Sequence, residues 1–323
     1  MKLKKFFPII GVAILVYIII RIEPQKIVAE IKEINFQLFS VAIFLTAFSL
    51  ITQTAKWFII AKTQKINVGF WNAFKINIIG FFYGFITPAK VGTVMRADYL
   101  KKYTQGDLNP GVNNFIIDKI FDLLSLVVIV VIFSFVFKEI LPVNYFYLSL
   151  LILAIFITMI MIFKNEERSK KILRVFYNHF IPSKVKDSLK DKFYSFYRNG
   201  PLKRYYIIFL IMSMINWVVL YLSIYFIGLS LGINISFLIF LAVMPIATLV
   251  GYIPITISGL GTREAVLIGL MGLFAVESTK VLSMSLLNIF IGGIIPSIIA
   301  IFLIIKIGNK TDEETKPDYS CPQ

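Results

Sequence analysis

Hydrophobic residues in this chain gather into long runs that are separated by short polar stretches. A run of about 20 apolar residues is long enough for a helix to cross the ~30 Å hydrocarbon core of a bilayer. Backbone groups within that core find no water, so a spanning segment satisfies them inside a helix. We therefore predict membrane-spanning helices over residues 6–20, 36–60, 115–137, 145–163, 205–231 and 281–305.

Two further apolar stretches are broken. Residues 71–86 form a short run that stops at Thr87-Pro88, and residues 235–276 are interrupted by prolines and glycines. Proline cannot continue a helix ladder and glycine weakens one. We expect an all-α polytopic membrane protein with eight apolar segments, of which about six are full transmembrane helices and two are broken or re-entrant. Ordinary spans that are merely kinked at glycine and proline are the alternative.

The first apolar run follows the basic sequence MKLKK, which is also how a secretory signal peptide begins. Such a peptide ends at a cleavage site made of small residues. No such site follows Ile20, where the chain continues Arg21-Ile22-Glu23. An uncleaved first transmembrane helix is therefore the preferred interpretation.

The two interruptions share the pattern T-x-x-x-x-G-T, at residues 87–93 and 256–262. A shift of 169 residues superimposes them, and it also carries residues 36–137 onto residues 205–306. We predict that these two windows are half-repeats of opposite orientation in a single transmembrane domain, residues 1–306, and that a polar, disordered tail follows at 307–323. Inverted repeats with interrupted helices at matching positions are typical of secondary transporters.

The distribution of charge predicts an orientation. The net charge is +15, and residues 164–204 hold 12 of the 33 lysines and arginines. The positive-inside rule places this segment and both termini in the cytoplasm, which indicates a multi-pass protein of the cell membrane. Apolar residues recur within the segment at helical spacing, as in amphipathic helices that lie on the inner leaflet. A platform that docks a partner protein is the alternative.

Composition excludes several classes of function. Hydrophobic residues make up 58% of the chain and charged residues 16%, against about 45–50% and about 25% in soluble domains. Basic residues lie beside apolar runs, so anionic lipid is a better partner than nucleic acid. The single histidine, His179, excludes a metal site built from several histidines, and the single cysteine, Cys321, excludes an intramolecular disulfide. The chain has no GxxxxGK[ST] motif. We expect no cofactor and no resident metal.

Several charged residues fall inside apolar segments, where a charge is costly and usually pairs or takes part in function. Asp118 and Asp122 lie four residues apart on one helical face, and Lys119 points about 100° away from them. The two carboxylates need a cation from elsewhere, in a structural salt bridge or in function. Lys56 and Lys75 are expected to extend their amines to the membrane surface. The candidate partners of the carboxylates are Lys90, Arg96 and Arg263.

A glycine-rich break precedes another charged pair. The sequence Gly259-Leu-Gly261-Thr262 lets the backbone turn tightly, and Arg263-Glu264 then opens an apolar helix. The first turn of a helix offers unpaired amides and a positive dipole end to an anion, and arginine adds a bidentate grip that suits phosphate. We interpret this segment as an anion site in which Glu264 either caps the amides or holds Arg263.

Three motifs at these positions resemble those of the lysylphosphatidylglycerol synthase transmembrane family, which also forms the flippase half of bacterial aminoacyl-phospholipid synthases. The family patterns are an FF pair followed by P-x-x-x-G-x-x-x-R, then D-R-x-x-D-L, then P-x-S-x-x-G-x-G-x-R-E. Here they are Phe81-Phe82 with Pro88, Gly92 and Arg96; Asp118-Lys119 with Asp122-Leu123; and Pro254 with Thr256, Gly259, Gly261 and Arg263-Glu264. The resemblance covers about residues 5–306.

The chain departs from the family patterns at a few positions. Lys119 stands in place of the usual arginine, Thr256 replaces a serine, and Lys90 and Thr93 stand where glycine or an acidic residue is commoner. These changes weaken any inference about the substrate more than they weaken the fold assignment. No aminoacyl-transferase domain is present in the sequence, so the resemblance implies the transport half without the lipid-modifying activity.

The leading functional hypothesis is a transporter that moves a phosphate-containing lipid, a phospholipid or a polyprenyl-linked lipid, between leaflets. An intramembrane enzyme acting on a lipid-linked substrate is one alternative, and an accessory subunit of a synthase or glycosyltransferase is another. A homodimer is also open. The residues expected to bind substrate are Arg263, Glu264, Gly259, Gly261, Thr256, Thr87, Pro88, Arg96, Asp118, Lys119 and Asp122.

Overall fold

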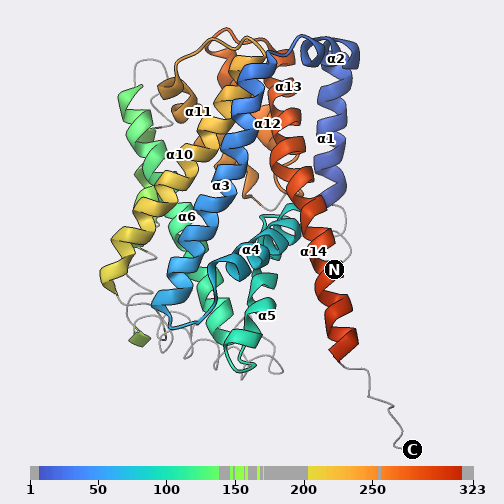
Figure 1. Cartoon of the computed structure of the whole chain (residues 1–323). Helices are drawn as coiled ribbons and strands as arrows, with labels where there is room; N and C mark the ends of the chain where they lie inside the picture. The colour runs from blue at the N-terminus through green and yellow to red at the C-terminus, as the bar shows by residue number, and fades with distance from the viewer. Residues whose placement is uncertain are drawn as a thin grey trace, which may run out of the picture.

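The computed structural model describes residues 7–137, 203–253 and 256–314, with short stretches between 146 and 170. Within these residues every regular element is a helix, and the only bridge of β type is an isolated one (Figure 1). The span predicted at 145–163 and the basic segment 164–204 lie almost entirely outside the described residues. The main helices are α1 (Phe7–Ile22), α2 (Pro24–Lys32), α3 (Phe36–Thr63), α4 (Phe70–Phe85), α5 (Arg96–Leu100), α6 (Asn109–Val136), α10 (Tyr206–Ser230), α11 (Phe237–Gly251), α12 (Thr262–Gly272), α13 (Ser278–Ile289) and α14 (Ile295–Glu314).

Among the residues that the structure describes, four helical stretches are long and apolar enough to cross a membrane: α3, α6, α10 and the continuous run Ser278–Ile307 that joins α13 to α14. They confirm the long apolar helices predicted at 36–60, 115–137, 205–231 and 281–305. α6 begins earlier than expected, at Asn109, with a proline in its first turn. Proline suits that position because the first amides of a helix have no partner in any case. α1 and α11 are shorter apolar helices.

α3 and α10 form the central pair of the bundle and lie side by side (Figure 1). Polar side chains join them within the apolar interior. The hydroxyls of Thr46 and Ser223 are 2.7 Å apart, and Thr52 donates to Asn216 at 2.8 Å. Later residues of α3 contact earlier residues of α10, so the two helices run antiparallel. Such contacts between small polar residues stabilise helix pairs where water is absent.

The first broken segment is α4 followed by a tight reversal. α4 crosses the middle of the bundle between α3 and α14 and ends at Phe85, as the sequence predicted (Figure 1). The chain then turns back through the 3-10 helix η2 (Val91–Met95), which packs on α4, into α5. Close approach of these elements depends on Gly80, because a Cβ added there would lie 2.2 Å from Cγ of Arg96.

The two interruptions meet each other. Pro88 and Ile257 form an antiparallel β-bridge, and the shift of 169 residues that aligns the two interruptions also carries one of these residues onto the other. Each break then turns through left-handed backbone, with φ of 51° at Ala89 and 49° at Ser258. Residues that are neither glycine nor asparagine rarely adopt this conformation, so the same unusual turn occurs at equivalent positions of both breaks.

The second half continues from α11 through its break into α12 and then into the long run α13–η5–α14. η5 (Phe290–Ile294) is a π-helical turn that contains the glycine pair Gly292-Gly293. Turns of this type are frequently found at functional sites. α14 remains helical to Glu314, past the expected start of the tail at 307, and the rest of the tail lies outside the described residues.

Candidate functional site

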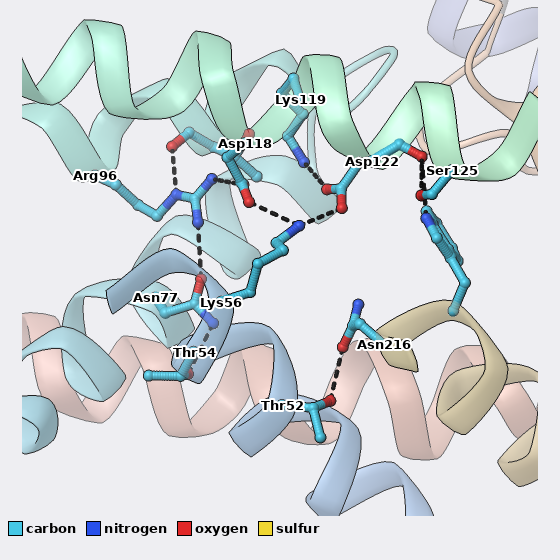
Figure 2. Close-up of polar contacts among 12 residues, drawn as sticks. Thr52, Thr54, Lys56, Asn77, Arg96, Asp118, Lys119, Asp122, Ser125 and Asn216 are labelled. Carbon is cyan, nitrogen blue, oxygen red and sulfur yellow. Dashed lines mark hydrogen bonds and ion pairs between the residues drawn. The ribbon is translucent and has the colours of Figure 1, made fainter. Parts of the chain in front are cut away.

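Two carboxylates on α6 share one lysine from α3. Figure 2 shows Lys56 lying between Asp118 and Asp122. Its Nζ is 2.8 Å from Oδ1 of Asp118 and also contacts Oδ1 of Asp122. All three side chains are buried. The expectation that Lys56 extends to the membrane surface is therefore wrong, because pairing with two carboxylates offsets the cost of burying its charge.

Arg96 occupies the other side of Asp118. Its Nη2 donates to Oδ2 of Asp118 at 2.7 Å, its Nη1 to Oδ1 of Asn77 at 2.9 Å, and its Nε to the backbone oxygen of Thr93 at 3.2 Å. Asn77 donates in turn to Thr54 at 3.0 Å. Arg96 is 2% exposed. The predicted pairing of Asp118 with a buried cation is confirmed, and the contacts of Arg96 assign it to the protein's own network.

Asp122 joins this network to a second lysine. Nζ of Lys119 lies 3.5 Å from Oδ2 of Asp122, and the side chain of Lys119 is 17% exposed. Trp217 of α10 donates its Nε1 to the backbone oxygen of Asp122 at 3.1 Å. Because Lys56 already neutralises Asp122, the longer contact leaves Lys119 with donors to spare.

The second break holds its charged pair by a different arrangement. Oε2 of Glu264 accepts the amide N–H of Gly261 at 2.7 Å, which satisfies the amide of the residue that caps the N-terminus of α12. Oε1 of Glu264 accepts from Nε and Nη2 of Arg263, at 3.1 and 2.8 Å, and from the hydroxyl of Ser285 at 2.7 Å. Glu264 thus both caps the helix and holds Arg263, the two roles that the sequence left open. The side chain of Arg263 stays 19% exposed.

A central cavity of about 140 Å³ lies where these groups meet. α3, α4, α6, α10, α11, the two breaks and η5 all contribute to its wall. Neutral hydrogen-bonding groups and aromatic rings, among them Tyr252, line it together with charged side chains. The amine of Lys90 lies 5.6 Å from the centre of the Tyr252 ring, and no carboxylate in the described part of the chain pairs with it. The charged lining residues are Lys90, Arg96, Lys119, Asp122 and Arg263.

The predicted site residues fall into three groups around the central cavity. Arg263, Arg96, Lys119 and Asp122 line it. Asp118 and Glu264 stand behind them and hold the arginines. The remaining predicted residues shape the two breaks and are not part of the lining: Thr87, Pro88, Thr256, Gly259 and Gly261.

Within the breaks, hydroxyl groups stabilise the turns. Oγ1 of Thr87 accepts the amide N–H of Gly92 at 2.8 Å, and the hydroxyls of Thr256 and Thr262 are 3.2 Å apart. A Cβ added at Gly92 would lie 2.1 Å from the backbone oxygen of Tyr83. The repeated T-x-x-x-x-G-T pattern therefore marks a tight turn inside the bundle.

Lys90 is a candidate for substrate binding that the sequence analysis did not predict. The sequence placed it only among possible partners of the carboxylates. The feature that could have identified it is its position two residues after Pro88, in the first interruption.

No group of three or more histidine, cysteine, aspartate or glutamate residues able to hold a metal occurs in the ranges that the structure describes.

Known proteins resemble this chain over most of its length. A family model described as the lysylphosphatidylglycerol synthase TM region matches residues 8–300. A UPF0104 membrane protein of Pyrococcus horikoshii is 25% identical over 326 residues, which cover 94% of this chain and 97% of that protein. Another, of Methanocaldococcus jannaschii, is 24% identical over 307 residues, which cover 90% of each chain. A third, of Methanothermobacter thermautotrophicus, is 25% identical over 299 residues, or 80% of this chain and 82% of the relative.

Proposed function

This chain belongs to the lysylphosphatidylglycerol synthase transmembrane family, as its motifs predicted, and on that premise we propose that it moves a phosphate-containing lipid between the two leaflets of its membrane. The central cavity, lined by cations where the two breaks meet, is the observation that carries the proposal. Lys90, Lys119 and Arg263 would bind the headgroup. The volume of about 140 Å³ is below the ~300–1,000 Å³ of pockets that enclose drug-sized ligands, so the headgroup enters and the acyl chains stay in lipid.

The helix boundaries support an inverted repeat. The shift of 169 residues carries α3 approximately onto α10, α4 onto α11, and the first residue of α6, Asn109, onto the first residue of α13, Ser278. Under the same shift, the contact of α4 with α14 is equivalent to the contact of α11 with α6. Secondary transporters with inverted repeats bind substrate near the bilayer midplane where broken helices meet. The position of the central cavity agrees with that rule.

The carboxylates of the site favour transport over an intramembrane enzyme. A general acid or base must be free to exchange a proton with its substrate. Asp118 is buried between Lys56 and Arg96, and Glu264 is buried against Arg263 and Ser285. Asp122, which lines the cavity, contacts Lys56 and lies 3.5 Å from Lys119, so all three carboxylates are paired with cations of the protein. An accessory role that uses residues 164–204 as a docking platform falls outside the described residues.

Reconstitution in liposomes tests the proposal through Arg263. Purified protein is placed in vesicles with a headgroup-labelled anionic phospholipid, and accessibility of the label to an impermeant quencher reports exchange between leaflets. Lysine keeps the charge of Arg263 but loses the bidentate fork, and alanine loses both. We expect the exchange rate to fall in the order wild type, Arg263→Lys, Arg263→Ala. Ser285→Ala is the matched control, because it removes a neutral partner of Arg263 and keeps the cation.

Stability measurements separate substrate binding from a purely structural role. If Arg263 binds the headgroup, exchange stays low even after Glu264→Gln removes the buried charge that Arg263→Ala leaves unpaired and so restores the melting temperature. If Arg263 only neutralises Glu264, Arg263→Ala loses stability and exchange together, and adding Glu264→Gln restores both. Full exchange by Arg263→Ala would refute the headgroup site. Chemical change of the labelled lipid, detected by mass spectrometry, would show an enzyme instead.

A further inference from the structure

The charges around the central cavity do not balance. Five cationic side chains and three carboxylates come together there, in the described part of the chain. The cations therefore exceed the carboxylates by two. The cations are Lys56, Lys90, Arg96, Lys119 and Arg263, and the carboxylates are Asp118, Asp122 and Glu264.

The excess falls on side chains that face the cavity. Lys56 and Arg96 are buried, and both are in direct contact with Asp118. The three partly exposed cations are Lys90, which no carboxylate holds, Lys119, whose contact with Asp122 is 3.5 Å long, and Arg263. The protein's own carboxylates thus neutralise the buried layer, and the layer that lines the cavity remains positive.

Uncompensated charge inside a membrane protein is costly, so a positive lining favours an anion in the cavity. The excess of two positive charges indicates the charge of the anion that would neutralise it. A phosphodiester headgroup carries one negative charge and would leave one cation unmatched. A phosphomonoester carries about 1.5 to 2 negative charges at neutral pH, and a diphosphate carries at least as many. Both groups also present more terminal oxygens to lysine and arginine donors.

We propose, on the basis of the proposed transport function, that the central cavity selects a lipid with a phosphomonoester or diphosphate headgroup over a lipid with a phosphodiester headgroup. Lys90 determines the selection. Without a bound anion no carboxylate pairs with its amine, so Lys90 gains most from the additional negative charge of a monoester or diphosphate. Lys119 and Arg263 bind the same headgroup from the other sides.

Binding to the detergent-solubilised full chain tests this selection directly. The probes are short-chain phosphatidic acid, a phosphomonoester; short-chain phosphatidylglycerol and phosphatidylcholine, which are diesters; and inorganic phosphate. At about pH 7 the monoester carries about 1.5 to 2 negative charges. We expect phosphatidic acid to bind about tenfold or more tightly than phosphatidylglycerol, as one extra charge-assisted contact would give. Lys90→Gln removes that preference, and Lys75→Gln, which removes an exposed lysine on α4, keeps it.

The binding results can contradict the proposed selection in several ways. Equal affinity for the monoester and the diester, or an unchanged preference in Lys90→Gln with an unchanged melting temperature, would overturn it. Inorganic phosphate that binds as tightly as phosphatidic acid would assign the site to a free ion and overturn the lipid source. The transport proposal fails separately: selective binding without leaflet exchange contradicts transport alone, whereas equal exchange of phosphatidylglycerol and phosphatidic acid contradicts selection alone.

Discussion

Asp118 illustrates how single residues hold this bundle together. Its two oxygens contact Nζ of Lys56 at 2.8 Å and Nη2 of Arg96 at 2.7 Å, and its side chain is fully buried. Asp118→Asn leaves these two cations with only Asp122 nearby, and breaking a buried pair in this way costs roughly 3–5 kcal/mol. We expect a large fall in the melting temperature in detergent. Asp98→Asn, which breaks an exposed pair with Lys101, should change it little.

A second substitution checks the cause of that fall. In the Asp118→Asn background, Lys56→Met removes one of the unmatched cations and should recover part of the lost stability. A melting temperature for Asp118→Asn equal to that of Asp98→Asn would contradict the paired arrangement. The same would follow if the double variant were no more stable than the single one.

Individual residues were predictable from the sequence only where a pattern marked them. The four-residue spacing of Asp118 and Asp122 showed that they share a face and need a cation. Lys56 was missed because it is a lone lysine in an apolar helix, and nothing local distinguishes a lysine that pairs from one that reaches the membrane surface. Its partner lies 66 residues along the chain. Only the packing of α3 against α6 brings the two together.

At the scale of elements, the second break depends on glycine. Gly259 has φ of 80°, and a Cβ added there would lie 2.6 Å from Cα of Gly251. Gly259→Ala must therefore strain the backbone and push α11 away from the start of α12, at a cost of roughly 1–3 kcal/mol. We expect a lower melting temperature and slower leaflet exchange. Gly269→Ala, in α12 with open space around it, is the control and should leave both unchanged or raise stability slightly. Equal melting temperatures for the two variants would show that the break tolerates a side chain.

Element types and most boundaries followed from hydrophobic length and from the positions of glycine and proline. The breaks after Phe85 and Gly251 were predictable because Thr87-Pro88 and the glycines interrupt apolar runs. The start of α6 at Asn109 was not, because its first turns are polar and carry no hydrophobic signal. The contact between the breaks, Pro88 with Ile257, could not be deduced from either segment alone.

At the scale of the whole molecule, the sequence and the structure together predict an orientation. The loops that follow α3 and α5 lie at the same end of the bundle as the start of α10 (Figure 1). Their sequences are basic, with Lys65 after α3, Lys101 after α5, and Lys203 and Arg204 just before α10. The loop between α10 and α11 lies at the opposite end (Figure 1). The positive-inside rule then predicts that the first end faces the cytoplasm, the side on which both termini are also expected from the sequence.

Thiol labelling on intact cells tests this orientation. In a Cys321→Ser background, Asn234→Cys lies in the exposed loop between α10 and α11, and Gln105→Cys lies in the exposed loop before α6. An impermeant reagent should label Asn234→Cys on intact cells, and it should label Gln105→Cys only after the membrane is permeabilised. Labelling after permeabilisation measures the total amount of each variant and so controls for expression.

The reverse labelling pattern would show that the protein has the opposite orientation in its membrane. The basic segment 164–204 would then lie outside, against the charge rule from which the orientation was predicted. Labelling of both positions on intact cells would place both loops on one side. It would contradict the antiparallel arrangement of α3 and α10 across the membrane, and with it the opposite orientation of the two halves.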